Sequence, residues 1–267
     1  MTFAPMQMPR PAPMATSRNM VAIASGKGGV GKTWLAITLS HALARSGRRA
    51  LLFDGDLGLA NIDIQLGLNP GQQDLGAVLS GRLTLSEAVT RFARGGFDVI
   101  AGQSGSGKLA HVPASRLQIL IADLGTLATG YDRVVLDVGA GVEQTVRRLA
   151  GQAGICAVVA TDEPSSLTDA YAFIKLTHLE RPGSDVRIVV NMASSAAEGE
   201  RTYHTLHTTC ERFLKISPPL LGIVRRDIRV REAIRNQEPI LTRFPASAAA
   251  CDVEAMAAKL IASAARP

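Results

Sequence analysis

The residues with the clearest chemical meaning form a glycine-rich stretch close to the N-terminus. Residues 26–33, GKGGVGKT, fit the pattern G-x-x-x-x-G-K-[ST] without a mismatch. In this pattern backbone N–H groups point at phosphate oxygens, Lys32 reaches the β- and γ-phosphates, and the hydroxyl of Thr33 binds Mg²⁺. The stretch therefore predicts a phosphate-binding loop, and the alternative is a glycine-rich turn without a ligand. The residues expected to contact the nucleotide here are Gly28, Gly29, Val30, Gly31, Lys32 and Thr33.

A second lysine, Lys27, lies at the front of the same loop. It lies on the rim of the loop, where a bound nucleotide is already served by Lys32. The alternative is a solvated surface lysine with no part in the chemistry.

Aspartates at the ends of two apolar runs would complete such a site. Asp54 and Asp56 come at the end of RALLFDGD, and Asp137 ends YDRVVLD. Because α/β sheets bind ligands beyond the carboxyl ends of their strands, these carboxylates are expected beside the phosphate loop. Asp56 can orient the attacking water or bind Mg²⁺ through water, and Asp137 suits the Mg²⁺ shell. Solvated carboxylates at turns and strand ends are the alternative. The sequence thus predicts Lys32 and Asp56 as catalytic residues and Thr33, Asp56 and Asp137 as metal ligands.

Short apolar runs alternate with helical patterns along the whole chain. The runs are nearly continuous rather than alternating, as is typical of strands buried on both faces of a parallel sheet. Strands are expected at 20–24, 49–54, 97–102, 131–138, 154–161, 185–192 and 220–224. Helices are expected from the phosphate loop to Gly47 and near 113–128, 143–152, 166–180, 199–213, 228–236 and 246–265. The pattern predicts an α/β fold, a doubly wound, mostly parallel sheet with helices on both faces.

The composition narrows the class of protein. Of the 267 residues, 46% are hydrophobic and 19% charged, which is enough apolar surface for a sizeable core. Aromatic residues make up only 4%, which argues against a base-stacking RNA-binding surface. The net charge of +6 permits acidic partners, such as nucleic acid, anionic lipid or nucleotide, and selects none of them. The three cysteines are scattered without a CxxC pair, which favours a reducing cytosol.

The first residues differ from the rest of the chain. Residues 1–19 are rich in Met and Pro and lack the apolar segment of a signal peptide, so they are expected to form a disordered tail. No apolar run approaches the roughly 18 residues of a membrane-spanning helix. A single cytoplasmic domain is therefore expected over 20–267.

The stretch KGGVGKT resembles the deviant Walker A signature of the MinD/ParA ATPase family. In that family the front lysine reaches the partner's nucleotide across a dimer interface, which implies that Lys27 acts in trans, like an arginine finger. The resemblance also implies a P-loop fold, ATP or ADP bound with Mg²⁺, an ATP-dependent homodimer and slow ATP hydrolysis. It places Asn191 at the adenine, with a turn cap as the alternative. Asn61 and Asp63 fall in the segment expected to change with the nucleotide.

Three more stretches, DGDLGLANID, DVGAG and EPSSLTDAYA, resemble the FlhG/FleN group of this family. This resemblance implies control of the number or placement of a cell-surface structure, above all flagella, together with a regulatory protein partner. Two alternatives remain. One is a ParA-like ATPase that partitions DNA or cargo, and the other is a nucleotide-binding regulatory module, an antiactivator, with little hydrolysis.

The chain departs from the family pattern at several positions. Trp34 replaces a second Thr, so it is expected to contact the nucleotide through its backbone N–H, unless the side chain simply packs on a helix face. Arg225 replaces a proline of the adenine-side loop, where Asp227 keeps the acidic position, and both are expected near the nucleotide. The five arginines of 225–235 suit a nucleic-acid or acidic-protein contact, or else a solvated helix face.

The C-terminal segment DVEAMAAKLIASAARP carries one apolar stripe and no basic cluster. This pattern favours a helix docked on the domain over an anchor at the inner face of the cell membrane, which stays the weaker expectation.

Two other stretches imitate functional sites. GQSGSGKL (102–109) resembles a second phosphate loop but has Leu109 where the Mg²⁺-binding hydroxyl belongs. His204, His207 and Cys210 are spaced along one helix, but no carboxylate is evident that would orient them around a metal. Neither stretch is predicted to be a site.

Overall fold

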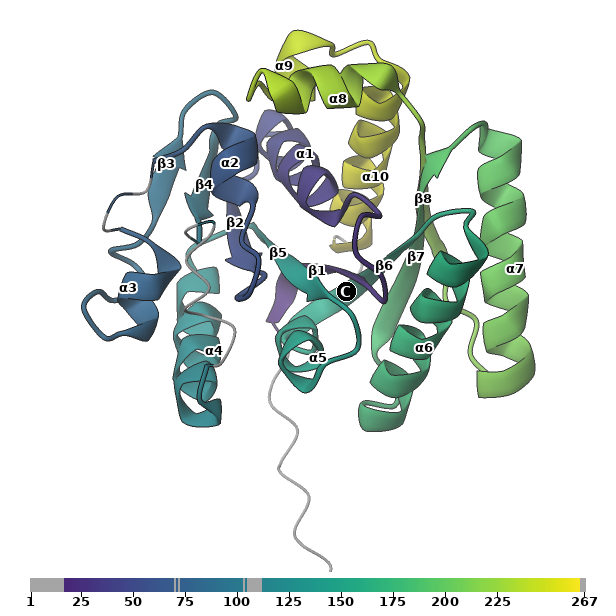
Figure 1. The fold of residues 1–267 in the computed structure, drawn as a ribbon, viewed down its shortest axis with the longest axis horizontal. Coiled ribbons are helices and arrows are strands. Elements are labelled where there is room, and N and C mark those ends of the chain that lie inside the picture. Colours follow the sequence, from purple (N-terminus) through teal and green to yellow (C-terminus); the bar gives the residue numbers. More distant parts are fainter. Residues whose placement is uncertain (1–16, 70, 72, 103, 105–111, 265–267) are drawn as a thin grey trace, which may run out of the picture.

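The computed structural model describes residues 17–69, 71, 73–102, 104 and 112–264. Its centre is an eight-stranded sheet with the order β3-β4-β2-β5-β1-β6-β7-β8, drawn in Figure 1. All neighbouring strands are parallel except β3 and β4, which are antiparallel. The strands are β1 (Ser17–Ser25), β2 (Ala50–Gly55), β3 (Thr90–Phe92), β4 (Phe97–Ile100), β5 (Arg133–Ala140), β6 (Ala153–Ala160), β7 (Asp185–Ala193) and β8 (Leu220–Arg225).

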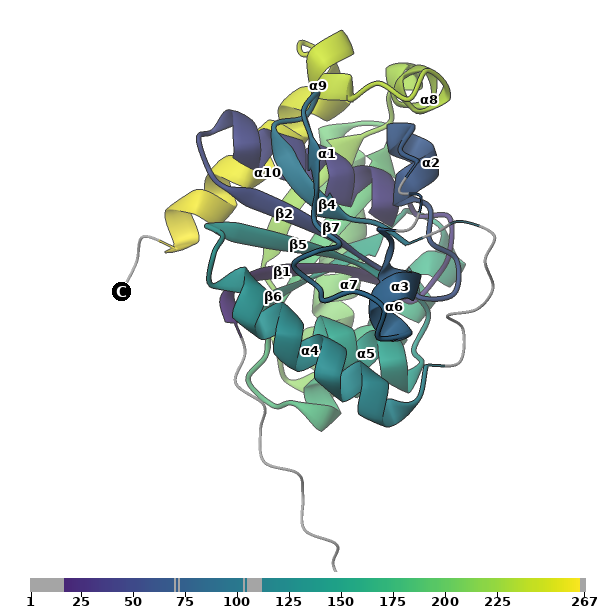
Figure 2. The same ribbon diagram turned by 90° about the vertical axis from the view of Figure 1, so that its left-hand side faces the viewer.

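Helices cover both faces of the sheet, as Figures 1 and 2 show. One face carries α1 (Lys32–Arg45), α8 (Ile228–Arg235), α9 (Ile240–Arg243) and α10 (Ala248–Ala264). The other carries α4 (Ala114–Ala128), α5 (Gln144–Ala150), α6 (Pro164–Glu180) and α7 (Ala196–Leu214). The short helices α2 (Ile62–Leu66) and α3 (Leu75–Leu79) follow β2 along the chain.

The side chains of the central strands are buried on both faces. In β1, Met20 and Ala22 pack into the cluster beneath α4 to α7, whereas Val21 and Ile23 pack into the cluster beneath α1 and α10. Successive side chains of a strand point to opposite faces, so burial of both faces requires an uninterrupted apolar run. This confirms the α/β, doubly wound fold class expected from the sequence.

Some local predictions differ from the structure. β1 begins at Ser17, so Ser17–Asn19 are not part of a disordered tail; the side-chain amide of Asn19 donates to the carbonyls of Ala128 (2.8 Å) and Tyr131 (2.9 Å). Residues 1–16 lie outside the described residues. The sequence did not predict β3, α2, α3 and α9. These elements span three to five residues, which is too short for a periodic pattern of apolar side chains.

Helix α10 packs on α1 and β8. Its stripe of Val253, Met256, Ala257 and Leu260 is buried, and the guanidinium of Arg133 donates to the carbonyl of Leu260 at 2.9 Å. The apolar stripe is therefore turned toward the domain. Within the described residues, no helix has the length and apolar character needed to cross a membrane.

A buried histidine makes the stability of the fold depend on pH. His41 in α1 is 5% exposed, and burial, with a smaller contribution from Arg45, lowers its pKa from 6.5 to about 4. Between pH 6.5 and 4, His41 therefore binds a proton in the unfolded chain but stays neutral in the folded chain. The contribution of His41 to the free energy of unfolding should therefore fall by up to about 3 kcal/mol as the pH drops from 6.5 to 4.

Urea unfolding across this pH range measures the effect. His41→Leu should remove this part of the pH dependence, whereas His204→Gln, at an exposed position, should keep it. A His41→Leu profile parallel to that of the unmodified chain would contradict the assignment.

Candidate functional site

The phosphate loop joins β1 to α1. Gly29 and Gly31 have φ angles of 80° and 87°, in the left-handed region that favours glycine, and Gly31 is the N-cap of α1. The first N–H groups of a helix lack intrahelical partners and attract anions. The segment therefore has the backbone form of an anion-binding loop at the carboxyl edge of the sheet, and contact of residues 28–33 with a nucleotide stays a prediction.

A lysine and a carboxylate are buried together behind this loop. Lys32 is 8% exposed; burial lowers its pKa, and the charges of Asp137 and Asp56 oppose that shift. Burial raises the pKa of Asp137 to about 7, although a hydrogen bond from the Thr33 side chain and the charge of Lys32 both lower it. Within the described residues, Asp137 Oδ1 is buried without a hydrogen-bond partner. A buried, unpaired carboxylate oxygen beside a threonine hydroxyl fits a Mg²⁺ ion.

Two more carboxylates approach this centre from β2. Asp54 is in register with Asp137 on the neighbouring strand, and burial raises its pKa well above the usual range, followed by the charge of Asp137. Asp56 lies just beyond the strand, where its Oδ1 accepts from the N–H of Leu59 at 3.0 Å. A Cβ added to Gly139 would lie 3.3 Å from that oxygen, so Asp56 faces the segment that follows Asp137. The structure thus brings Lys32, Asp56 and Asp137 together, as predicted.

This centre is not a closed metal cage. The described residues contain no group of three or more His, Cys, Asp or Glu side chains arranged to hold a metal ion. Mg²⁺ at a phosphate site does not need one, because it takes most of its ligands from substrate phosphates and water.

Lys27 is held by its own chain. Its Nζ donates to Glu163 Oε2 at 2.6 Å and to Ser165 Oγ at 2.8 Å, and its side chain is 36% exposed. Glu163 is the N-cap of α6, within the EPSS stretch that resembles the FlhG/FleN group. Sequence reasoning singled out that stretch without finding its contact with Lys27.

Asn191 supports the phosphate loop from behind. It is 3% exposed, its Nδ2 donates to the carbonyl of Val30 at 2.7 Å, and its Oδ1 accepts from the N–H of Met192 at 2.9 Å. Met192 has a positive φ of 59°, which is uncommon for a side chain other than glycine or asparagine. The amide therefore fixes the loop in this structure, and its contact with adenine stays a prediction.

The Trp34 side chain is packed inside the domain. It is 7% exposed and lies in the apolar cluster of α1, where it lines a small cavity with Leu66 of α2 and Ile240 of α9. The indole ring therefore packs on a face of α1, as the alternative in the sequence analysis expected, because α2 and α9 cover that side of the helix. Only the backbone N–H remains for the predicted nucleotide contact.

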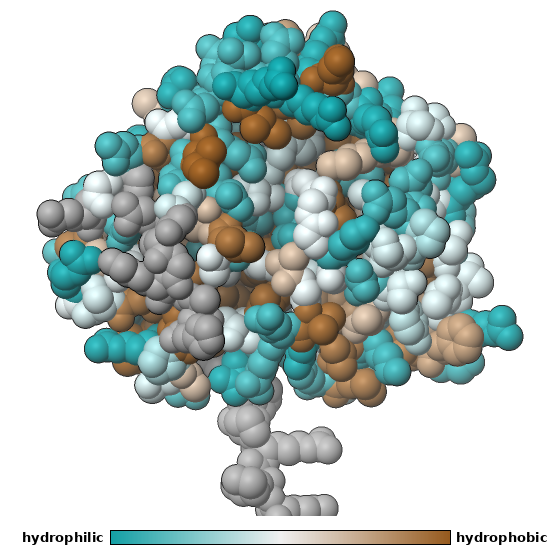
Figure 3. All heavy atoms as spheres, viewed as in Figure 1, coloured by the Kyte–Doolittle hydropathy of each residue, from teal (hydrophilic) through white to brown (hydrophobic). Residues whose placement is uncertain are grey.

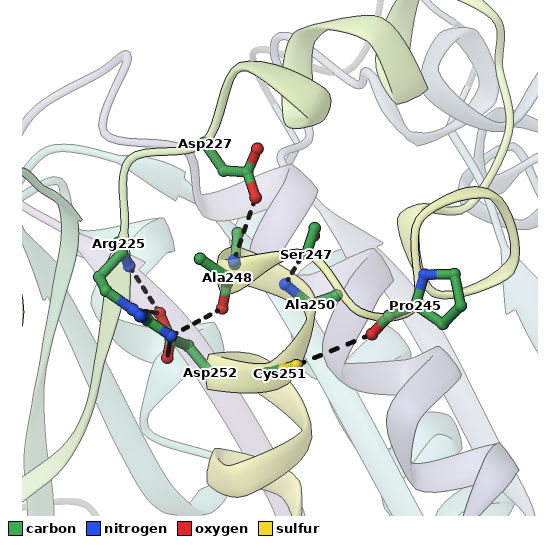
Figure 4. A network of polar contacts seen from close by, with 9 residues as sticks. Arg225, Asp227, Pro245, Ser247, Ala248, Ala250, Cys251 and Asp252 are labelled. Atoms are coloured by element: carbon green, nitrogen blue, oxygen red, sulfur yellow. Dashed lines mark hydrogen bonds and ion pairs between the residues drawn. The ribbon is translucent and has the colours of Figure 1, made fainter.

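Arg225 and Asp227 tie together the C-terminal helices, as Figure 4 shows. The guanidinium of Arg225 forms a bidentate pair with Asp252 of α10, with Nε–Oδ2 2.9 Å and Nη2–Oδ1 2.8 Å. Asp227 caps α8 by accepting from the N–H of Arg229 at 2.9 Å and from that of Ala249 at 3.4 Å. The guanidinium of Arg225 is therefore held against α10 in this structure, and a contact of Arg225 and Asp227 with the nucleotide stays a prediction.

The stretch that imitates a second phosphate loop contacts the segment after β2. The N–H of Ser104 donates to Asp63 Oδ2 at 3.0 Å, and its hydroxyl donates to Asp63 Oδ1 and, at 2.7 Å, to the carbonyl of Ala60. Residues 103 and 105–111 lie outside the described part of the chain. The described contacts therefore hold the end of the Asp56–Asp63 segment in place.

Three comparisons place these features among known proteins. Residues 21–240 match the family described as the CobQ/CobB/MinD/ParA nucleotide binding domain. The antiactivator FleN of Pseudomonas aeruginosa is 36% identical over 241 residues, covering 90% of this chain and 85% of FleN. The flagellum site-determining protein YlxH of Helicobacter pylori is 30% identical, over 82% of this chain and 76% of YlxH. The septum site-determining protein MinD of Pyrococcus horikoshii, complexed with Mg-ADP, has the same fold, with a TM-score of 0.79 and 24% identity over 93% of this chain and 98% of that one.

Proposed function

Since the chain belongs to the CobQ/CobB/MinD/ParA nucleotide-binding family, whose MinD and ParA members are ATPases, we propose that it is an ATP-hydrolysing switch controlling the number or placement of flagella. The observation that carries the ATPase function is the cluster of the buried Lys32 and Asp137 with the half-buried Asp56 behind a glycine loop. The flagellar output is supported by the relatives named as an antiactivator and as a flagellum site-determining protein.

Substrate binding follows from the loop geometry. The N–H groups of 28–33 and the ammonium of Lys32 would bind the β- and γ-phosphates, and Thr33 and Asp137 would hold Mg²⁺. The ion, when bound, neutralises charge on the phosphates. Asp56 has an open carboxylate beside Gly139, and it orients the water that attacks the γ-phosphate.

Lys27 acts on the partner's nucleotide in a dimer. In the described chain its ammonium is taken up by Glu163 and Ser165, on the rim of the loop. This pair is exposed, so exchanging Glu163 for a phosphate group of a second subunit costs little. ATP therefore favours a dimer in which both Lys27 side chains cross the interface.

Exposed apolar side chains support an interface at this edge. Leu59 (74% exposed) follows β2, Val142 (37%) follows β5 and Ile228 (83%) follows β8. The carboxyl ends of parallel strands meet at one edge, so these side chains lie at the same edge of the sheet as the phosphate loop. Figure 3 shows apolar patches scattered among polar ones on the face drawn. A second copy of the chain covers them in the ATP-bound dimer.

The switch acts through a protein partner in the cytoplasm. Its nucleotide state decides which surfaces a regulatory protein meets, as expected for an antiactivator. A peripheral contact with the inner face of the membrane is the weaker part of the proposal, because the apolar stripe of α10 is buried.

Phosphate release from purified protein tests the enzymatic function. With ATP and Mg²⁺ we expect slow turnover, below about 1 s⁻¹, because such a switch uses ATP as a timer. Lys32→Ala should abolish it and serves as the background. If the unmodified chain releases no more phosphate than Lys32→Ala, with or without a partner, the chain is a nucleotide-binding module instead.

One surface feature favours a second candidate, a ParA-like partitioning ATPase. Helix α8 and the residue before Asp227 present exposed arginines, namely Arg226, Arg229, Arg231 and Arg235. Binding of nonspecific duplex DNA that requires ATP and weakens steeply with salt would promote this function. DNA binding without ATP dependence would remove it.

A further inference from the structure

A cleft of about 670 Å³ opens at the edge of the sheet opposite the phosphate loop. We call it the arginine cleft: its walls carry Arg18, Arg147, Arg148, Glu180, Arg181 and Asp185 together with residues 151–154 and 182–184. It lies where β1, β6 and β7 begin and where α5 and α6 end. Because β1 rises about 3.3 Å per residue, the cleft is roughly 25 Å from the phosphate loop.

Both acidic residues of the cleft are already neutralised. The guanidinium of Arg147 pairs with Glu180 through Nε–Oε2 (3.0 Å) and Nη2–Oε1 (2.6 Å). The guanidinium of Arg187 pairs in the same way with Asp185, at 2.9 and 2.7 Å.

The remaining cleft arginines are uncompensated. Arg18, Arg148 and Arg181 form no ion pair with any residue that the structure describes. Residues 1–16, which precede β1, contain Arg10 and no aspartate or glutamate, so they cannot supply side-chain carboxylates. The cleft therefore has an excess of positive charge that the chain's own acidic side chains leave unmatched.

We propose that the arginine cleft binds an acidic segment of a partner protein. Its volume lies in the range of pockets that enclose a small ligand or a few side chains. Carboxylates are planar acceptors that match the guanidinium fork.

The walls disfavour other polyanions. Among the described residues that line the cleft there is no aromatic side chain on which a base could stack. The carboxylates of Glu180 and Asp185 keep lone pairs that accept from peptide N–H groups, whereas a phosphodiester backbone offers only acceptors. A glutamate-rich peptide offers carboxylates to the arginines and backbone N–H groups to Glu180 and Asp185.

The site is separate from the nucleotide chemistry. Dimerisation uses the opposite edge of the sheet, so the cleft stays accessible with either nucleotide, and binding should not require ATP hydrolysis. A failure of the proposed ATPase function would therefore leave this proposal intact, and the reverse also holds.

Fluorescence anisotropy with the full chain and a fluorescein-labelled glutamate-rich peptide tests the proposal. The double variant Arg148→Glu/Arg181→Glu should weaken binding at least about tenfold, since it removes two close charge pairs and adds repulsion. The matched variant Arg229→Glu/Arg231→Glu changes the charge equally on α8 and should bind within about twofold of the unmodified chain. Arg148→Gln/Arg181→Gln should also weaken binding, and its unchanged thermal unfolding would show that folding is intact.

Three outcomes would overturn the proposal. The first is that the peptide fails to bind the unmodified chain. The second is that the α8 variant loses as much affinity as the cleft variant. The third is that the cleft binds an oligonucleotide or a phosphatidylserine vesicle instead of the peptide.

Discussion

Lys27→Ala is expected to bind ATP and to lose nearly all hydrolysis, at least about a hundredfold in phosphate release, as when a charge beside a transferring phosphate is removed. Lys27 contacts Glu163 and Ser165 in its own chain and is separate from the buried Lys32 cluster, so the substitution should spare nucleotide affinity. Phosphate release and binding of a fluorescent ATP analogue measure the two properties separately. A Lys27→Ala protein that dimerises with ATP and hydrolyses it normally would show that the lysine has no role in trans.

A mixture of variants separates action in trans from action in cis. Lys27→Ala and Asp56→Asn should each be inactive alone. In a mixed dimer the Lys27→Ala subunit keeps its own Asp56 and receives Lys27 from the Asp56→Asn partner, so one complete site forms. Mixing should therefore restore hydrolysis if Lys27 crosses the interface, and restore none if it serves its own nucleotide.

Asp56→Asn should reduce hydrolysis by about 10²–10⁴ while leaving ATP binding and ATP-dependent dimerisation in place, because an amide cannot accept a proton or orient water as a carboxylate does. The carboxylate of Asp56 faces Gly139 beyond the strand, whereas Asp54 and Asp137 are buried in the sheet. Single-turnover phosphate release and size-exclusion chromatography with ATP measure the two parts of the prediction.

Asp123→Asn provides the control, since this residue is exposed on α4 and is not part of the predicted site. Hydrolysis by Asp56→Asn within about twofold of the control would assign the water-orienting role to another residue, since one well-placed base contributes much more than that.

Much of the fold and of the site could be predicted because the signals are local. The glycine loop is one contiguous motif, and the strands from 20 to 224 are apolar runs whose burial on both faces follows from their composition. Lys32, Asp56 and Asp137 meet because parallel strands bring their carboxyl ends to one edge, a property of the fold class. The missed elements, such as β3 with three residues, carry too few side chains to show a period.

By itself, the sequence determined the phosphate loop, the parallel sheet and the acidic strand ends, since each is written in neighbouring residues. Only the tertiary structure decided which partner each side chain takes. Lys27 meets Glu163 across 136 positions of sequence, and Asn191 meets the carbonyl of Val30 across 161. Trp34 packs beside α2 and α9, and Arg225 pairs with Asp252 of α10, because these helices offer an apolar surface and a carboxylate there. Such contacts depend on how distant helices pack, and no pattern along the chain encodes them.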